Sequence, residues 1–447
     1  MYILTNGRLI TRDPDARGYY EKGAVVYEGS KIVEVGEEAA LTAKYPQAEK
    51  IDAKGGVIMP ALINAHTHIY SALARGLSIV GNNPTNFLEV LEGTWWAIDR
   101  HLTLEGTRAS ADALYIDCIK QGVTTIFDHH ASYCQIPGSL FQIGESAKKF
   151  GIRSCLCYEV SDRDGEEKCL EAIRENADWI TYCREHNDPM LAAMFGGHAL
   201  FTISDKTFDR MVEANNGRTG YHIHVSEGMN DVYDSLQNYG RRPVQRLQDH
   251  GILGEKTILG HCIHVNTAEM ELIRETGTMV VNNPESNMGN AIGICPVLQL
   301  YKRGILLGMG TDAYTNDMLE SLKVALCSQR SQNCLPNVGW CEVTDMLFKN
   351  NAKIGEKYFP DTLGVLKAGA AADIIVMDYK PFTPFSDENI DGHMIFGMTG
   401  RQCQTTIAAG KLLMKDRELV GIDEEAENAH ILEASRKLWG TLNHREY

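Results

Sequence analysis

Short apolar runs alternate with longer stretches of helical periodicity between residues 60 and 360. The apolar runs, which follow a first strand leading into His66, are Thr124–Asp128, Arg153–Glu159, Ala192–His198, Gly220–Val225, Thr257–His261, Thr278–Asn282 and Leu306–Thr311. The helical stretches between them include Leu104–Gln121, Cys169–His186, Thr267–Glu275 and Ser321–Gln329. This alternation predicts parallel βα units and an α/β fold. Eight strands match a closed (β/α)8 TIM barrel, and no glycine fingerprint favours the alternative, an open doubly wound sheet.

Both ends of the chain show short strand patterns instead. The early runs are Tyr2–Leu4, Arg8–Thr11, Ala24–Glu28, Lys31–Val35 and Gly56–Met59, and the late runs are Asp373–Asp378, Thr405–Ala409 and Leu412–Met414. Gly29-Ser30 and Gly410-Lys411 are hairpin signals. We therefore expect residues 1–59 and 365–420 to form a small composite β-sandwich beside a barrel of residues 60–364. Residues 421–447 should form a C-terminal helical segment.

Composition and charge restrict the partners. The 447 residues carry 43 Lys and Arg against 59 Asp and Glu, a net charge of −16. This charge disfavours nucleic acid and anionic membranes as partners, and we interpret it as a solubility feature. The twelve cysteines form no paired CxxC arrangement, which is typical of reduced thiols in a cytoplasmic protein. Neither a signal peptide nor an apolar run of roughly 20 residues is visible.

The first candidate site is His66-Thr67-His68, which follows the apolar run 57–63. Residues two apart on a strand point to the same side, so both imidazoles can face one metal ion. Such pairs also occur by chance. The position at the C-terminal end of the first barrel strand nevertheless favours a metal site, because barrel enzymes carry their chemistry at that end.

A second candidate follows the fifth predicted strand, in the segment His222-Ile-His224-Val-Ser-Glu227. One of the two imidazoles can join the same metal. Glu227 lies just beyond the strand and is suited to general acid–base work on a water molecule at the metal. A solvated loop glutamate is the alternative interpretation.

Two further strand ends carry the same kind of residue. His261 ends the sixth strand, and Asp312 ends the eighth in Gly310-Thr311-Asp312. An aspartate there can also cap the following helix. Together, the ends of strands one, five, six and eight offer histidines and a carboxylate. Three histidines and one carboxylate suit zinc or ferrous iron.

These motifs resemble those of the amidohydrolase superfamily, in its cytosine/guanine deaminase and chlorohydrolase branch. The matching segments are PALINAHTH at 60–68, HxxE at 224–227, His261, NPxSN at 283–287 and GTD at 310–312. Within that branch the chain is most similar to the SsnA-like group of aminohydrolases, through Asp128-His129-His130-Ala131-Ser132, Glu285-Ser286-Asn287-Met288 and Gly392–Gly397.

The resemblance implies a role for each matched residue. One divalent metal, zinc with Fe(II) as the alternative, would be bound by His66, His68, His224 and Asp312. Glu227 would be the proton shuttle, and the catalytic set would also include His261 and Asp312, which orient the attacking hydroxide. Related two-metal enzymes use a lysine at the end of strand four. Met194–His198 holds none, so one metal is expected.

The resemblance further implies hydrolytic deamination of a purine-like or pyrimidine-like base, with release of ammonia. The alternatives are hydrolysis of a cyclic amide bond and dechlorination of a related heterocycle. A scaffold that only binds partners is disfavoured because all four ligands and Glu227 are present. A homo-oligomer would fit the resemblance, but no residue specifies one.

Candidate substrate contacts follow the first strand at Tyr70, Arg75 and Trp95. Aromatic faces suit a flat heterocycle, and Arg75 could pair with a carbonyl oxygen or a carboxylate. Trp95 could instead anchor a helix on the barrel. His198 ends the fourth strand, and Asn283 and Asn287 follow the seventh. All three are candidate contacts as well.

Overall fold

The computed structural model describes all 447 residues and contains the predicted barrel. Its strands are β6 (Leu62–Thr67), β7 (Val123–His130), β8 (Arg153–Tyr158), β9 (Leu191–Ala193), β10 (Phe195–Ala199), β11 (Tyr221–Val225), β12 (Ile258–His261), β13 (Met279–Asn282) and β14 (Leu307–Met309). All neighbouring pairs are parallel. Parallel bridges Thr67–Asp312 and Val160–Gly197 join the two sheets into a closed ring.

The fourth barrel strand is interrupted. β9 pairs with β8, and β10 pairs with β11, with Met194 alone between the two segments. Gly196 lies against the backbone here, and a Cβ atom at this position would come within 2.3 Å of the Tyr158 carbonyl oxygen. β9 and β10 therefore act as one strand, and the barrel has the predicted eight.

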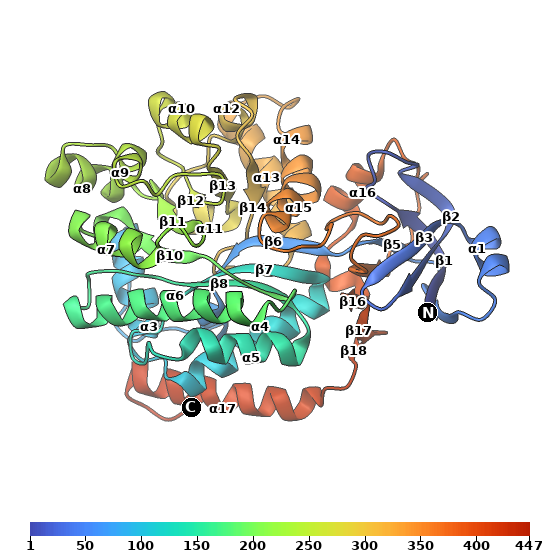
Figure 1. Cartoon of the computed structure of the whole chain (residues 1–447), viewed down its shortest axis with the longest axis horizontal. Helices are drawn as coiled ribbons and strands as arrows, with labels where there is room; N and C mark the ends of the chain where they lie inside the picture. The colour runs from blue at the N-terminus through green and yellow to red at the C-terminus, as the bar shows by residue number, and fades with distance from the viewer.

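Helices surround the barrel (Figure 1). The longer ones are α4 (Leu104–Gln121), α5 (Ser139–Phe150), α6 (Glu166–His186), α7 (Asp205–Asn215), α8 (Met229–Tyr239), α10 (Thr267–Thr276) and α13 (Met318–Asn333). Shorter ones are α2 (Phe87–Val90), α3 (Trp96–Asp99), α9 (Pro243–Asp249), α11 (Pro284–Gly289), α12 (Val297–Lys302), α14 (Trp340–Asp345) and α15 (Asn351–Glu356). The α4 bounds match the prediction because Thr103 caps its start and Gly122, with φ of 77°, ends it.

The two ends of the chain meet in one composite β domain, at the right of Figure 1. Its strands are β1 (Tyr2–Ile10), β2 (Tyr19–Glu28), β3 (Lys31–Glu37), β4 (Glu49–Asp52), β5 (Val57–Pro60), β15 (Ile374–Met377), β16 (Cys403–Ala408), β17 (Lys411–Lys415) and β18 (Glu418–Leu419). Hydrogen bonds connect all nine into a single mixed sheet. The two runs expected at Tyr2–Leu4 and Arg8–Thr11 are one strand, β1, with a register shift near Gly7. Helices α1 (Glu38–Lys44) and α16 (Ile390–Gly397) complete the domain.

This domain leads directly into the site. β5 pairs with β15 of the other chain end, and only Ala61 separates β5 from the first barrel strand. The C-terminal helix α17 (Glu424–Asn443), red in Figure 1, packs on α4 and on the 3-10 helix Ile69–Ala74 that follows β6. No helix combines the length and apolar character needed to cross a membrane.

Candidate metal centre and catalytic pocket

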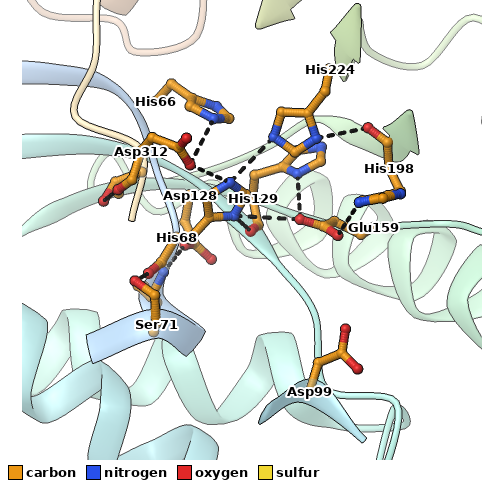
Figure 2. Close-up of polar contacts among 12 residues, drawn as sticks. His66, His68, Ser71, Asp99, Asp128, His129, Glu159, His198, His224 and Asp312 are labelled. Atoms are coloured by element: carbon orange, nitrogen blue, oxygen red, sulfur yellow. Dashed lines mark hydrogen bonds and ion pairs between the residues drawn. The ribbon is translucent and has the colours of Figure 1, made fainter. Parts of the chain in front are cut away.

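Four predicted ligands converge at the C-terminal end of the barrel (Figure 2). The Nε2 atom of His68 lies 2.9 Å from Oδ1 of Asp312, and that of His66 lies 3.8 Å from the same oxygen. The Nε2 atoms of His68 and His224 are 3.2 Å apart. His66 lies on β6 and His68 directly follows it, His224 lies on β11, and Asp312 follows β14. Folding of the barrel therefore brings together residues that are distant in sequence.

The hydrogen bonds of the three histidines fit a metal site. His66 Nδ1 lies 2.8 Å from His222 Nε2, and His224 Nδ1 lies 2.8 Å from the His198 carbonyl oxygen. His68 Nδ1 bonds to the His129 carbonyl oxygen. Because their partners are carbonyl oxygens, His68 and His224 donate their Nδ1 protons to the protein and direct Nε2 toward the site, as metal-binding histidines do. The Nε2 atom of His66 is buried without any hydrogen-bond partner, which a metal ion would satisfy.

Glu227 and His261 stand beside this cluster. Glu227 Oε1 lies 3.7 Å from His261 Nε2, and Asp312 Oδ2 lies 3.8 Å from the same nitrogen. Asn287 donates to Asn282, so its oxygen accepts from His261 Nδ1 at 2.7 Å. Burial raises the pKa of Glu227 well above its usual value, and the Asp312 carboxylate adds to the effect. Both effects favour the protonated form of the Glu227 carboxyl group.

The electrostatics of the cluster separate one histidine from the others. Burial lowers the pKa of His66 and of His224 well below the usual value, with neighbouring histidines adding to the shift. Burial also opposes a charge on His68, but Asp312 and Glu159 outweigh it and raise the pKa of His68 to about 9. Neutral imidazoles at His66 and His224 are the form that binds a metal.

Three of these strand ends have left-handed backbone. Asp312 has φ of 56°, His261 has φ of 67°, and Ser226, just before Glu227, has φ of 49°. L-amino acids other than glycine rarely adopt this conformation. Such positions cluster at functional sites, where the surrounding structure enforces them.

Glu159 is a buried site residue that the sequence reasoning missed. It follows β8, is 2% exposed, and its Oε1 atom lies 3.0 Å from His129 Nδ1 and 3.4 Å from His68 Nδ1. A usable signal was present, because Glu159 is the last residue of the predicted strand Arg153–Glu159. The strand-end reasoning applied to Asp312 applies equally there.

The six predicted substrate contacts lie in three places. Tyr70, Trp95 and His198 line a pocket of about 30 Å³ together with His68, His224, Glu159, Glu227 and Asp312. Arg75 instead lines an adjoining cavity of about 140 Å³, and its Nη2 atom lies 2.8 Å from the Asp117 carboxylate. Asn287 bonds to His261, and Asn283 Nδ2 lies 3.4 Å from His261 Nε2. The two asparagines therefore face His261, and substrate contact by all six residues stays a prediction.

Comparisons with known proteins identify the family. The amidohydrolase family matches residues 57–413, and an imidazolonepropionase-like composite domain of bacteria matches residues 23–48. The chain belongs to the amidohydrolase family. A 5′-deoxyadenosine deaminase of Methanosarcina mazei is 30% identical over 453 positions, which cover 99% of each chain. The predicted family and the enzyme class that it implies, a hydrolase, are thereby confirmed.

Solved structures confirm the fold. An adenosine deaminase from Xanthomonas campestris with bound zinc has a TM-score of 0.86 at 22% identity and covers 98% of both chains. An atrazine chlorohydrolase from Arthrobacter aurescens complexed with zinc has a TM-score of 0.79 at 23% identity, over 97% of this chain and 100% of the other. The TIM barrel with its composite β domain is therefore the shared architecture.

Proposed function

We propose that this chain is a metal-dependent aminohydrolase that removes an amino group from a purine-like or pyrimidine-like ring and releases ammonia. The observation that carries the proposal is the convergence of three Nε2 atoms and the Asp312 carboxylate beside Glu227, whose side chain is 13% exposed. A deaminase relative that aligns over 99% of the chain supports the same reaction type.

His66, His68, His224 and Asp312 would hold the ion. Three imidazole nitrogens and one carboxylate oxygen suit zinc, and they also suit Fe(II). Zinc in two structural neighbours supports the first choice. When bound, such an ion lowers the pKa of a water molecule to about 7 and so supplies a nucleophile at neutral pH.

The protein's own residues handle protons and position. Glu227 would carry one proton of the attacking water to a ring nitrogen and would later carry the proton of the hydroxyl group on the attacked carbon to the departing amine, so that a carbonyl group forms. His261, fixed by Asn287, directs its Nε2 atom toward the space between Glu227 and Asp312. Tyr70 and Trp95 would flank the ring, since both line the pocket.

Two related reactions would use the same residues. Hydrolysis of a cyclic amide bond would open the ring and release no ammonia. Dechlorination is suggested by the chlorohydrolase neighbour, but a likeness at 23% identity supports the fold alone. Ammonia release therefore separates deamination from both alternatives.

The test is a screen of aminated purines, pterins and pyrimidines, measured by coupled ammonia assay and by ultraviolet change. Activity should be lost on chelation and regained with zinc or Fe(II), with about one ion per chain by elemental analysis. Ring-opened products without ammonia would contradict the proposal.

We also propose a cellular compartment and a partner class for the enzyme. Twelve free cysteines favour a reducing compartment, and we place the protein in the cytoplasm. The substrate is a small molecule. Homo-oligomerisation stays a prediction, which light scattering of the purified protein would test.

A further inference from the structure

Two hydrogen-bond acceptors face each other in the wall of the catalytic pocket (Figure 2). Glu159 Oε2 and His198 Nε2 lie 3.8 Å apart, too far for a bond between them. Both residues line the pocket and are buried, with 2% and 5% of their surface exposed. No hydrogen bond to the protein engages either atom, so both are available to a ligand.

The tautomer of His198 follows from its neighbour. The Thr202 hydroxyl has one hydrogen, which it donates to the Ala199 carbonyl oxygen at 2.9 Å. Its oxygen lies 2.8 Å from His198 Nδ1 and therefore accepts the Nδ1 proton. The neutral His198 ring then presents a lone pair at Nε2. An acceptor, rather than a donor, faces the pocket.

Glu159 is held in place from its other side. The two ring nitrogens of His129 face oxygens, the His222 carbonyl oxygen at 2.9 Å and Glu159 Oε1 at 3.0 Å. His68 Nδ1 is a second neighbour of Oε1, at 3.4 Å. Oε1 is thus occupied by histidines, while Oε2 of the same carboxylate points to His198. Such a fixed acceptor selects ligands strongly, because a buried polar group left unpaired is costly.

We propose that Glu159 and His198 form a specificity pair for heterocycles whose ring nitrogens carry hydrogen. This inference rests on the proposed deamination. Lactam-type amino bases such as guanine and isocytosine offer ring N–H donors besides the amino group that leaves. Adenosine-type nucleosides offer none, because N1, N3 and N7 are acceptors and N9 bears the sugar. The pocket should therefore prefer free lactam-type bases to adenine nucleosides.

The first experiment compares kcat/KM for guanine and isocytosine with that for adenosine and 5′-deoxyadenosine, using the metal-loaded enzyme. We expect the lactam-type bases to be the better substrates. A preference for the nucleosides would overturn the specificity pair and leave the deaminase function standing. Absence of ammonia from every aminated ring in the wider screen would instead remove the deaminase function and the inference with it.

Variants test the two acceptors. Glu159→Gln should lower the ratio of base to nucleoside kcat/KM by about tenfold to a hundredfold, as for a hydrogen bond to a charged group. Thr202→Val should lower the same ratio by a smaller factor, because the His198 ring is neutral. Thr202→Val leaves both Glu159 and His198 in place. It removes the hydroxyl group that holds the His198 proton at Nδ1, so that the proton can move to Nε2. Because Glu159 also neighbours His68, metal content is measured in parallel. A metal defect would lower turnover of all substrates and leave the ratio unchanged.

Glu175→Gln is the matched control. Glu175 is also a buried carboxylate, but it accepts from the backbone N–H groups of Gly138 and Leu140 and lies outside the pocket. Its substitution should leave the ratio unchanged. A ratio that both Glu159→Gln and Thr202→Val leave intact would refute the specificity pair.

Discussion

His68 Nε2 contacts Asp312 Oδ1 at 2.9 Å, beside the Thr67–Asp312 bridge that closes the barrel. The first and last barrel strands therefore meet where two proposed metal ligands meet. Closure of the ring and assembly of the ligand set depend on the same few residues. Changes at this seam should affect metal binding before they affect the rest of the fold.

Asp312→Asn tests the carboxylate ligand. The amide keeps the size of the side chain but loses the charge that a divalent ion needs. We expect metal content, measured by elemental analysis after dialysis, to fall well below one ion per chain, with activity falling in parallel. Asp317→Asn is the control, because Asp317 caps α13 and lies outside the cluster. If the Asp312→Asn variant kept one metal ion per chain, the Asp312 carboxylate would be excluded as a ligand.

Glu227→Gln separates proton transfer from metal binding. Because Glu227 is proposed as the shuttle and not as a ligand, the variant should retain metal. Turnover should fall by about 10²–10⁴-fold, the usual contribution of a general acid–base. Glu269→Gln keeps a capping side chain on α10 and serves as the control. Near-normal kcat in Glu227→Gln would assign the proton to another group.

Asn443→Ala tests the attachment of α17 to the segment after β6. Its side chain accepts from Val80 N–H at 2.7 Å and donates to the Ser78 carbonyl oxygen at 3.1 Å. The variant should speed hydrogen exchange in residues 76–86 and cost about 1 kcal/mol of unfolding free energy. Thr441→Ala on the same helix removes only a bond to Lys437 and should leave this exchange unchanged.

Arg153→Met tests a buried ion pair between the barrel and the β domain. Arg153 is fully buried at the start of β8 and bonds to Asp373, with Asp361 3.3 Å away. Removing the cation leaves a buried carboxylate uncompensated, so unfolding free energy should fall by about 3–5 kcal/mol in chemical denaturation. The double variant Arg153→Met/Asp373→Leu should recover part of this loss. If the double variant recovered none of the unfolding free energy, the unpaired Asp373 carboxylate would not be the cause of the loss.

Glu175 predicts a pH dependence of stability. Burial raises its pKa from 4.5 to about 7, while the N–H groups of Gly138 and Leu140 work in the opposite direction. Between pH 4.5 and about pH 7 the Glu175 carboxyl group is therefore more protonated in the folded chain than in the unfolded chain. Its contribution to stability therefore falls as the pH rises from 4.5 through 7. Glu175→Gln should flatten the melting temperature against pH over this window, and an unchanged profile would contradict the shift.

Hydrophobic periodicity was sufficient to predict the barrel strands, because buried parallel strands read as short apolar runs. Helix α4 was predicted to the residue, since Thr103 and Gly122 mark its ends locally. The break at Met194 was not predictable, because it depends on how β9 and β10 pair with different neighbours. The joining of the two chain ends into one sheet is likewise a tertiary outcome.

At the site, polar residues at the ends of predicted strands are the ones that the structure brings together. They are His66, His68, His224, Glu227, His261 and Asp312. Glu159 also ends a predicted strand, but only the structure shows that its carboxylate meets His129 and His68. Asn283 and Asn287 follow β13 as expected, yet their side chains turn to His261. Direction of a loop side chain is set by the packing around it, which local sequence does not encode.

The left-handed backbone at Ser226, His261 and Asp312 limits how this enzyme can be redesigned. Each such residue costs of order 1–3 kcal/mol, which the rest of the barrel must offset. Exchanges that look stabilising here, such as a β-branched residue at 226, would force the strand end to re-route and carry Glu227 with it. Consensus or thermostability engineering should therefore leave these three turns untouched and seek its gains in the outer helices and the β domain.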